Sequence, residues 1–401
     1  MKIKVRWIEY LLLYILIISS LVFKALGLDI VLIVITYITA LLFFLDRRKN
    51  NEINESIKVL VLFFGCMLMS TLVGVLTKTA QISGIFIDIT IFCFVYIGVF
   101  SGMNLNVDII LDYIRRIFFL GVYFALLELI IGENLLLPFF YVDNISINSR
   151  ICSIYVHPVI AACFFGVSFW FIIYSKTNTY LRGILAVFVL LALFKTGSRS
   201  SWLAFLICLL LWIYKNIRER ITLKRMFIGI SIMIAGILFF NTPFGKQIIE
   251  GINERIILAD QSISMLQRTG SWKYILSAFF KESNPFQLLF GYGYKGSFGK
   301  MLETVILIPD FFTVDNTYIA SLYNYGVLNL MVILITLLLV TKAFLKNDDN
   351  TLSLIEISII SIAISCFFFE CNYFLNISFF LYFFVGVYIG MKRKTAVDKN
   401  E

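Results

Sequence analysis

One arginine of this sequence lies in a short polar stretch between two apolar runs, a position that suggests a binding or catalytic role. Arg199 follows Ser198 within residues 195–201, KTGSRSS. A guanidinium makes bidentate, charge-assisted hydrogen bonds to phosphate oxygens, and the neighbouring hydroxyls supply further donors. We therefore interpret Arg199 and Ser198 as a candidate site for a phosphate or diphosphate. The structural alternative is an interfacial arginine in a tight turn.

A second arginine, Arg268, lies four residues before Trp272 in a stretch whose apolar residues have helical spacing. Residues four apart share one face of a helix, so both side chains would meet the same ligand. We take Arg268 as a catalytic candidate and Trp272 as a substrate-binding candidate. A structural cation–π contact or a surface ion pair is the alternative for Arg268.

Two further polar stretches adjoin apolar runs. In residues 314–318, VDNTY, the carboxylate of Asp315 could orient a nucleophilic hydroxyl or hold a sugar, and Asn316 and Tyr318 are substrate-binding candidates beside it. A simple helix N-cap is the alternative. In residues 150–158, RICSIYVHP, the binding candidates are Arg150 and the only histidine, His157, although a lone histidine is more often structural.

The elements that must position these residues are membrane-spanning helices. Of the 401 residues 60% are apolar and 15% are charged, which excludes a soluble globular protein. Backbone groups in lipid need internal hydrogen bonds and strand-type alternation is absent, so the spans are helices. We expect an all-α polytopic membrane protein, with residues 1–401 as one integral membrane domain. Apolar runs predict twelve spans, near residues 7–26, 29–45, 57–76, 83–101, 112–131, 158–174, 181–195, 201–214, 224–240, 317–340, 353–369 and 375–391.

The distribution of positive charge orients these spans. With both termini placed in the cytoplasm, roughly two thirds of the 34 Lys and Arg residues fall on the cytoplasmic side. The short outer segments hold only Lys24, Lys78, Arg150, Lys195 and Arg199. Most of the +9 net charge is therefore topogenic, and we expect no nucleic-acid partner.

One long segment, residues 241–316, lies between the ninth and tenth spans and is predicted to be extracytoplasmic. Its spacing of apolar residues indicates two amphipathic helices, one over 248–257 and one over 265–279 that stops near Asn284-Pro285. Such helices could lie on the outer leaflet or form a lid over a cavity. The glycine-rich residues 291–296, GYGYKG, are a poor nucleotide signal, and we interpret them as a flexible turn.

The metal-ligating residue types are sparse. The seven cysteines contain no CxxC pair, and a single histidine removes the usual zinc ligands. We predict neither a metal site nor a cofactor.

Four blocks of the sequence together resemble one family. These are KTGSRSSWLAF at 195–205, RICSIYVHPVIA at 150–161, RTGSW at 268–272 with the following LLFGYGYKGS, and DNTYIASLYNYGVL at 315–328. Their order, topological side and twelve-span frame resemble the O-antigen ligase and Wzy-type polysaccharide polymerase superfamily. The resemblance covers roughly residues 145–345.

The resemblance implies a metal-independent, membrane-embedded glycosyltransferase of the helical GT-C kind in the bacterial cytoplasmic membrane. Its substrate would be an undecaprenyl-diphosphate-linked oligosaccharide repeat unit. Arg199 and Arg268 would bind the donor diphosphate, and Asp315 would sit beside the acceptor. A hydroxyl attacking opposite the diphosphate would invert the anomeric carbon.

Ligases of this superfamily usually carry histidine where this chain has Asp315, so the sequence favours a polymerase of capsular polysaccharide or O-antigen. The chain-length regulator and the flippase of the same pathway are the partners this implies. The alternatives are a polysaccharide ligase and, in a different class, a lipid-linked oligosaccharide flippase. The long outer segment and the outer arginines argue against the flippase.

Overall fold

The computed structural model describes residues 2–25, 29–47, 55–136, 150–155, 157–218, 263–309, 311–371 and 374–397. Over these residues the chain is helical and contains no strand. The helices are α1 (Lys2–Ala25), α2 (Asp29–Arg47), α3 (Glu55–Leu76), α4 (Ser83–Asn104), α5 (Val107–Ile131), α6 (Pro158–Ile173), α7 (Thr179–Lys195), α8 (Arg199–Arg218), α11 (Ile263–Glu282), α12 (Pro285–Phe290), α13 (Gly296–Met301), α14 (Thr317–Phe344), α15 (Asn350–Ser365) and α16 (Leu375–Val397), with a 3-10 turn, η2, at Ser153–Tyr155.

Each predicted span except 224–240 coincides with one of these helices. The span at 224–240 and the predicted amphipathic helix at 248–257 lie outside the described residues. Three stretches within the described residues are long and apolar enough to cross a membrane on their own: α4, α14 and residues 375–395 of α16. Together with the shorter apolar helices they make the chain a helical multi-pass membrane protein.

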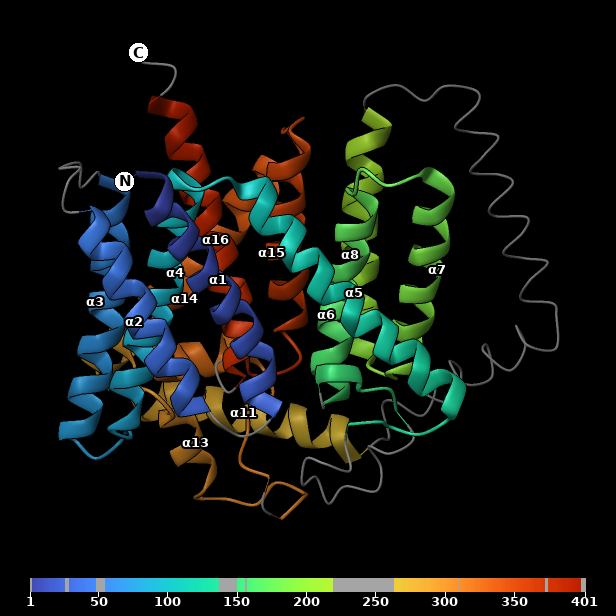
Figure 1. The fold of residues 1–401 in the computed structure, drawn as a ribbon. Helices are drawn as coiled ribbons and strands as arrows, with labels where there is room; N and C mark the ends of the chain where they lie inside the picture. The colour runs from blue at the N-terminus through green and yellow to red at the C-terminus, as the bar shows by residue number, and fades with distance from the viewer. Residues whose placement is uncertain are drawn as a thin grey trace.

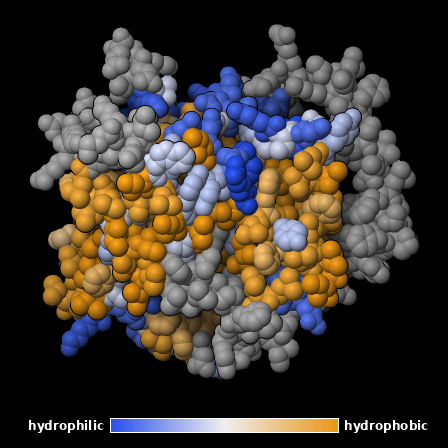
Figure 2. Space-filling model, viewed as in Figure 1, coloured by the Kyte–Doolittle hydropathy of each residue, from blue (hydrophilic) through white to orange (hydrophobic). Residues whose placement is uncertain are grey.

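The helices stand side by side, and both termini lie at one end of the bundle (Figure 1). Helix α11 lies across the opposite end together with α13, and we call this end the α11 end. Apolar side chains form a broad belt between the two ends, with hydrophilic residues gathered above it (Figure 2). Large exposed side chains such as Leu76, Ile130 and Leu338 belong to faces that suit lipid.

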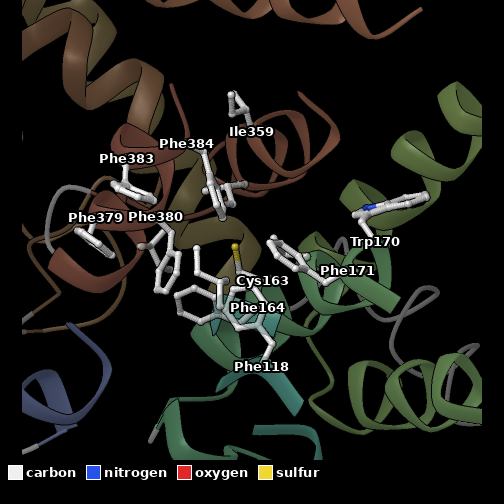
Figure 3. Packing of buried hydrophobic residues seen from close by; sticks show 14 of the residues in the cluster. Phe118, Cys163, Phe164, Trp170, Phe171, Ile359, Phe379, Phe380, Phe383 and Phe384 are labelled. Atoms are coloured by element: carbon white, nitrogen blue, oxygen red, sulfur yellow. The ribbon is translucent and has the colours of Figure 1, made fainter. Parts of the chain in front are cut away.

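The packed centre of the molecule is built on α6. This helix is apolar all round, and nearly every one of its residues is buried, as expected for a helix surrounded by other helices. Phe118 of α5 contacts Phe171 at 5.1 Å and Phe380 of α16 at 5.4 Å between ring centroids (Figure 3). The aromatic cluster thus ties α5, α6 and α16 together beside the loops that carry the candidate residues.

Helices α4 and α16 cross at glycines. Gly98 and Gly102 of α4 face Gly386 and Gly390 of α16, and a Cβ on any of the four would clash with the backbone of the other helix. Small residues four apart let two helix backbones approach closely in a membrane, where dispersion contacts stabilise the pair. The α4–α16 pair is therefore specified by two GxxxG motifs that hydropathy does not reveal.

Helix α14 is broken at Gly326, whose backbone is left-handed with φ 76°. Residues 291–293 fill the break: the Tyr292 and Gly293 backbone N–H groups donate to the carbonyls of Tyr323 and Asn324 at 3.0 and 2.7 Å. Non-helical backbone within a membrane protein must find such partners. The interpretation of 291–296 as a flexible turn was therefore wrong, because the segment is buried and locks the α11 end against α14.

Candidate functional site

Arg268 and Asp315 form an ion pair at the α11 end. Helix α11 covers the segment where the second amphipathic helix is predicted, and it directs Arg268 toward the loop before α14. The Arg268 Nε donates to Asp315 Oδ2 at 2.9 Å, with 26% and 20% of the two side chains exposed. Of the Arg268 nitrogens, only Nε donates a hydrogen bond to Asp315. Among the described residues, the two terminal nitrogens of this guanidinium are therefore available to a ligand.

Trp272 anchors the same loop one turn further along α11. Its Nε1 donates to the Val314 carbonyl at 2.9 Å, so Arg268 and Trp272 do share a face. Asp315 itself has a left-handed backbone with φ 52°, which is uncommon for a residue with a side chain. The Thr313 hydroxyl donates to Asp315 Oδ1 at 3.0 Å and fixes the other carboxylate oxygen.

Asn316 is the N-cap of α14. Its side-chain oxygen accepts from the N–H groups of Tyr318 and Ile319 at 2.9 and 3.0 Å, which explains why the helix begins here. Asn316 rather than Asp315 has the capping role, so the Asp315 carboxylate makes no hydrogen bond to the first turn of α14. Tyr318 points away from the loop and donates to the Ala363 carbonyl at 2.7 Å. The structure thus gives Asn316 and Tyr318 supporting contacts.

The loop between α15 and α16 forms a wall behind α14. The Thr317 hydroxyl donates to the Phe369 carbonyl at 2.7 Å and accepts from the Cys371 N–H at 2.8 Å. These two contacts flank Glu370, which is 3% exposed and which our sequence reasoning missed. An acid in a short polar island between two apolar runs, FFFECNYF, is the signal that marks it.

Arg150 belongs to a second group of contacts, with the 195–201 turn. Its Nε donates to the Thr196 carbonyl at 2.5 Å, and the Ile151 N–H donates to the Lys195 carbonyl at 3.5 Å. Glu128 of α5 holds the same stretch in place by accepting from the Cys152 and Ser153 N–H groups at 3.1 and 2.8 Å. The two polar stretches that the sequence singled out are thus joined.

Arg199 is the first residue of α8 and is partly buried. The preceding Ser198 is 3% exposed, and its hydroxyl lies 3.0 and 3.2 Å from the hydroxyls of Ser200 and Ser201. A cationic side chain at a helix start with hydroxyls on three neighbouring residues suits an anion, because the helix N-terminus is itself electropositive.

His157 connects the two groups. It is the N-cap position of α6, its ring lies 5.7 Å from that of Phe374, and its Nδ1 has no hydrogen-bond partner among the described residues. Burial, together with the charge of Arg150, lowers the pKa of His157 to about 4, and the charge of Asp315 opposes this shift. Both charges therefore lie within electrostatic reach of one neutral imidazole.

The arrangement is cationic and suited to an oxyanion. Arg150, Arg199 and Arg268 bring three guanidinium groups to one end of the bundle, where Asp315 is the carboxylate held against one of them. Preorganised donors of this kind stabilise negative charge that develops on a leaving group. Among the described residues no cluster of His, Cys, Asp or Glu is arranged to hold a metal ion.

Residues 184–334 match the family model described as O-antigen ligase. This segment is similar to the O-antigen ligase family. The match confirms the family resemblance and supports an enzyme of the ligase or polymerase type, and it gives no support to a flippase. The matched segment includes Arg199, Arg268 and Asp315, whereas Arg150, His157 and Glu370 lie outside it. No curated protein matches the chain.

Proposed function

We propose that this protein is a polymerase that joins undecaprenyl-diphosphate-linked oligosaccharide repeat units into a capsular polysaccharide or O-antigen. The observation that carries the proposal is the Arg268–Asp315 pair within the segment that matches the O-antigen ligase family. It sets a diphosphate-binding group and an acceptor-orienting group side by side. The reaction is assigned to the outer face of the bacterial cytoplasmic membrane, with twelve spans in a GT-C-like frame and both termini cytoplasmic.

The chemistry follows from where charge develops. As the acceptor hydroxyl bonds to the anomeric carbon of the donor and releases its proton to solvent, the bond from that carbon to the diphosphate oxygen breaks and negative charge grows on the leaving group. Arg268 and Arg199 stabilise that charge without a metal, because fixed guanidinium groups in a partly dry site act strongly on it. Attack from the face opposite the diphosphate inverts the anomeric carbon.

Asp315 is suited to orienting the acceptor. Each of its oxygens already receives one hydrogen bond, from Arg268 or Thr313, and keeps a further acceptor site for a sugar hydroxyl. Held in place by Arg268 and Thr313, the Asp315 carboxylate aims the acceptor hydroxyl. Asp315 in place of the histidine usual in ligases favours a polymerase.

A cavity beside the site supports a lipid-linked donor. It measures about 680 Å³, lies between α14, α15 and α16, and is lined mostly by apolar side chains. Thr317 and Tyr318 line it at the α11 end, and Val340 and Arg393 line it toward the termini. Its lining residues run along α14 from Thr317 to Val340, on both sides of the break at Gly326, so the space suits a long apolar chain.

The proposal is tested by the glycan of strains that carry single variants. Arg199→Ala and Arg268→Ala should abolish polymer and leave single repeat units on lipid. Lysine at either position should restore little, because a point charge lacks the bidentate geometry. Arg116→Ala is the matched control, since that side chain is 76% exposed and pairs with Asp112 on α5. Polymer of normal length in both alanine variants would reject the proposed roles.

The ligase is distinguished by its acceptor. A polymerase yields a ladder of products from lipid-linked repeat units alone, whereas a ligase needs a second, terminal acceptor. Absence of a ladder from repeat units together with transfer to an added acceptor would assign the ligase.

A further inference from the structure

The buried acid in the α15–α16 loop is not used by the mechanism above. Glu370 is 3% exposed, and its Oε2 has no hydrogen-bond partner among the described residues. The carbonyl and N–H of its two chain neighbours, Phe369 and Cys371, are both bonded to the Thr317 hydroxyl. Its backbone is therefore fixed to the start of α14, two residues from Asp315. Burying an acid this deeply is costly, which calls for a function.

The Glu370 side chain reaches the loop that Arg268 contacts. The Val314 backbone N–H hydrogen-bonds to its carboxyl, while the Val314 carbonyl accepts from Trp272. Val314 is fully buried, so these two contacts hold its peptide groups from opposite sides. The next residue is Asp315, whose left-handed backbone persists only if its neighbours enforce it.

We propose that Glu370 is a positioning residue of the candidate site: through Val314 it holds the loop in which Asp315 meets Arg268. The expected effect of Glu370 on catalysis rests on the proposed function. The positioning of the loop stands on the contacts alone.

The charge state of Glu370 follows from its surroundings. Burial raises its pKa well above the ordinary range, and the nearby Asp315 and Cys371 raise it further, against the opposing effects of Val314 and Lys295. The other groups facing this region are Tyr294, which Glu370 influences, and Arg268, which pairs with Asp315. These surroundings disfavour the charged form of Glu370, and the neutral form leaves the positive charge of the site to an anionic donor.

Glutamine and alanine separate this role from others. Glu370→Gln keeps the shape and the acceptor oxygen and carries no charge, so it should keep wild-type turnover. Glu370→Ala loses the acceptor for Val314 and should lower turnover by about tenfold or more, because a displaced Asp315 no longer aligns the acceptor. Glu303→Gln is the matched control, because Glu303 is an exposed carboxylate at the same end. The assay uses the full-length protein in vesicles with lipid-linked repeat units.

The pH profile gives a readout that a merely structural residue would not move. In the wild type, ionisation of Glu370 as the pH rises adds a negative charge near Asp315 and should raise the donor KM. The Glu370→Gln variant should lack this rise. Loss of turnover in Glu370→Gln equal to that in Glu370→Ala would overturn the proposal in favour of a proton-transferring base. Wild-type turnover in Glu370→Ala would overturn it outright.

Amide hydrogen exchange tests the positioning without any substrate. The Val314 amide should exchange about tenfold faster or more in Glu370→Ala, and at the wild-type rate in Glu370→Gln. Unchanged exchange in both variants would refute the role of Glu370. Faster exchange of the Val314 amide in Glu370→Ala, together with a wild-type protein that makes no polymer, would support the positioning role of Glu370 and reject the proposed function.

Discussion

At the scale of single residues, the site is defined by what each charged group is bonded to. Asp315 has two hydrogen-bond partners and a strained backbone. Asn316, and not Asp315, caps α14. Burial keeps His157 a neutral imidazole, and the charges of both Arg150 and Asp315 act on it. Its neutrality matters because a positive histidine beside Arg150 would be repelled in the folded protein.

The stability of the protein should fall in acid because of His157. Its pKa is lowered from 6.5 to about 4, so the unfolded chain takes up the proton first as the pH falls across that window. The contribution is fully present above pH 6.5 and is lost progressively toward pH 4. Thermal unfolding of purified protein at pH 7.5 and pH 5 measures this. His157→Gln should lose less stability between these two values than the wild type, and an equal loss would contradict the assignment.

At the scale of elements, hydropathy predicts where the helices lie but not how they pair. The spans 83–101 and 375–391 are visible as apolar runs because lipid selects for them. Their crossing depends on glycines nearly 290 residues apart in the chain, which no local pattern relates. The break in α14 and the burial of 291–293 in it depend on a similar long-range contact.

For the candidate site too, the sequence predicts individual residues but not the long-range contacts between them. The sequence singles out Arg199, Arg268 and Asp315 because polar residues between apolar runs are conspicuous. That Arg268 pairs with Asp315 could not be predicted, since the two lie 47 residues apart and meet only when α11 crosses the end of the bundle. Glu370 was missed because its importance arises from burial and from its contact with Val314.

The α4–α16 crossing should be intolerant of even one methyl group. Gly386→Ala places a Cβ against the Val95 carbonyl and the Gly98 Cα, and should destabilise the protein by about 1–3 kcal/mol. Gly65→Ala is the control, because nothing lies within 4 Å of the added Cβ there. Alanine is the better helix former, so this variant should be neutral or slightly stabilising. Equal melting temperatures for the two variants would refute the close crossing.

The cavity along α14 should discriminate donors by the length of their lipid chain. Leu337 lines it, whereas the adjacent Leu338 does not and is 69% exposed. Leu337→Trp should raise the KM of a long-chain donor about tenfold, a loss of roughly 1.4 kcal/mol, and leave a short-chain donor unaffected. Leu338→Trp should change neither value. A long-chain KM that is the same in both variants would exclude the cavity as the chain site.

At the scale of the whole molecule, the α11 end gathers the candidate residues and the other end gathers the termini (Figure 1). From the charge distribution of the sequence we propose that the end with the termini faces the cytoplasm. The apolar belt between the two ends covers both flanks of the face shown in Figure 2. An active site on the outer side could then receive lipid-linked units only after they have crossed the membrane.

Thiol accessibility tests this orientation. A cysteine at Glu303 should react with a membrane-impermeant reagent while the cytoplasmic membrane is intact. A cysteine at Asp348, in the exposed α14–α15 connection, should react only after permeabilisation. The native cysteines give a low background, since all but the half-buried Cys66 are buried. Labelling with the opposite pattern would invert the topology and place the site in the cytoplasm.

The central claim is that Arg268 and Asp315 form the site of a polymerase acting on lipid-linked repeat units. The direct measurement is the product of purified protein in vesicles supplied with undecaprenyl-diphosphate-linked repeat units and no other acceptor. We predict a ladder of oligomers from the wild type and from Arg116→Ala, and only the starting unit from Arg268→Ala. A ladder that persists in Arg268→Ala would contradict the account.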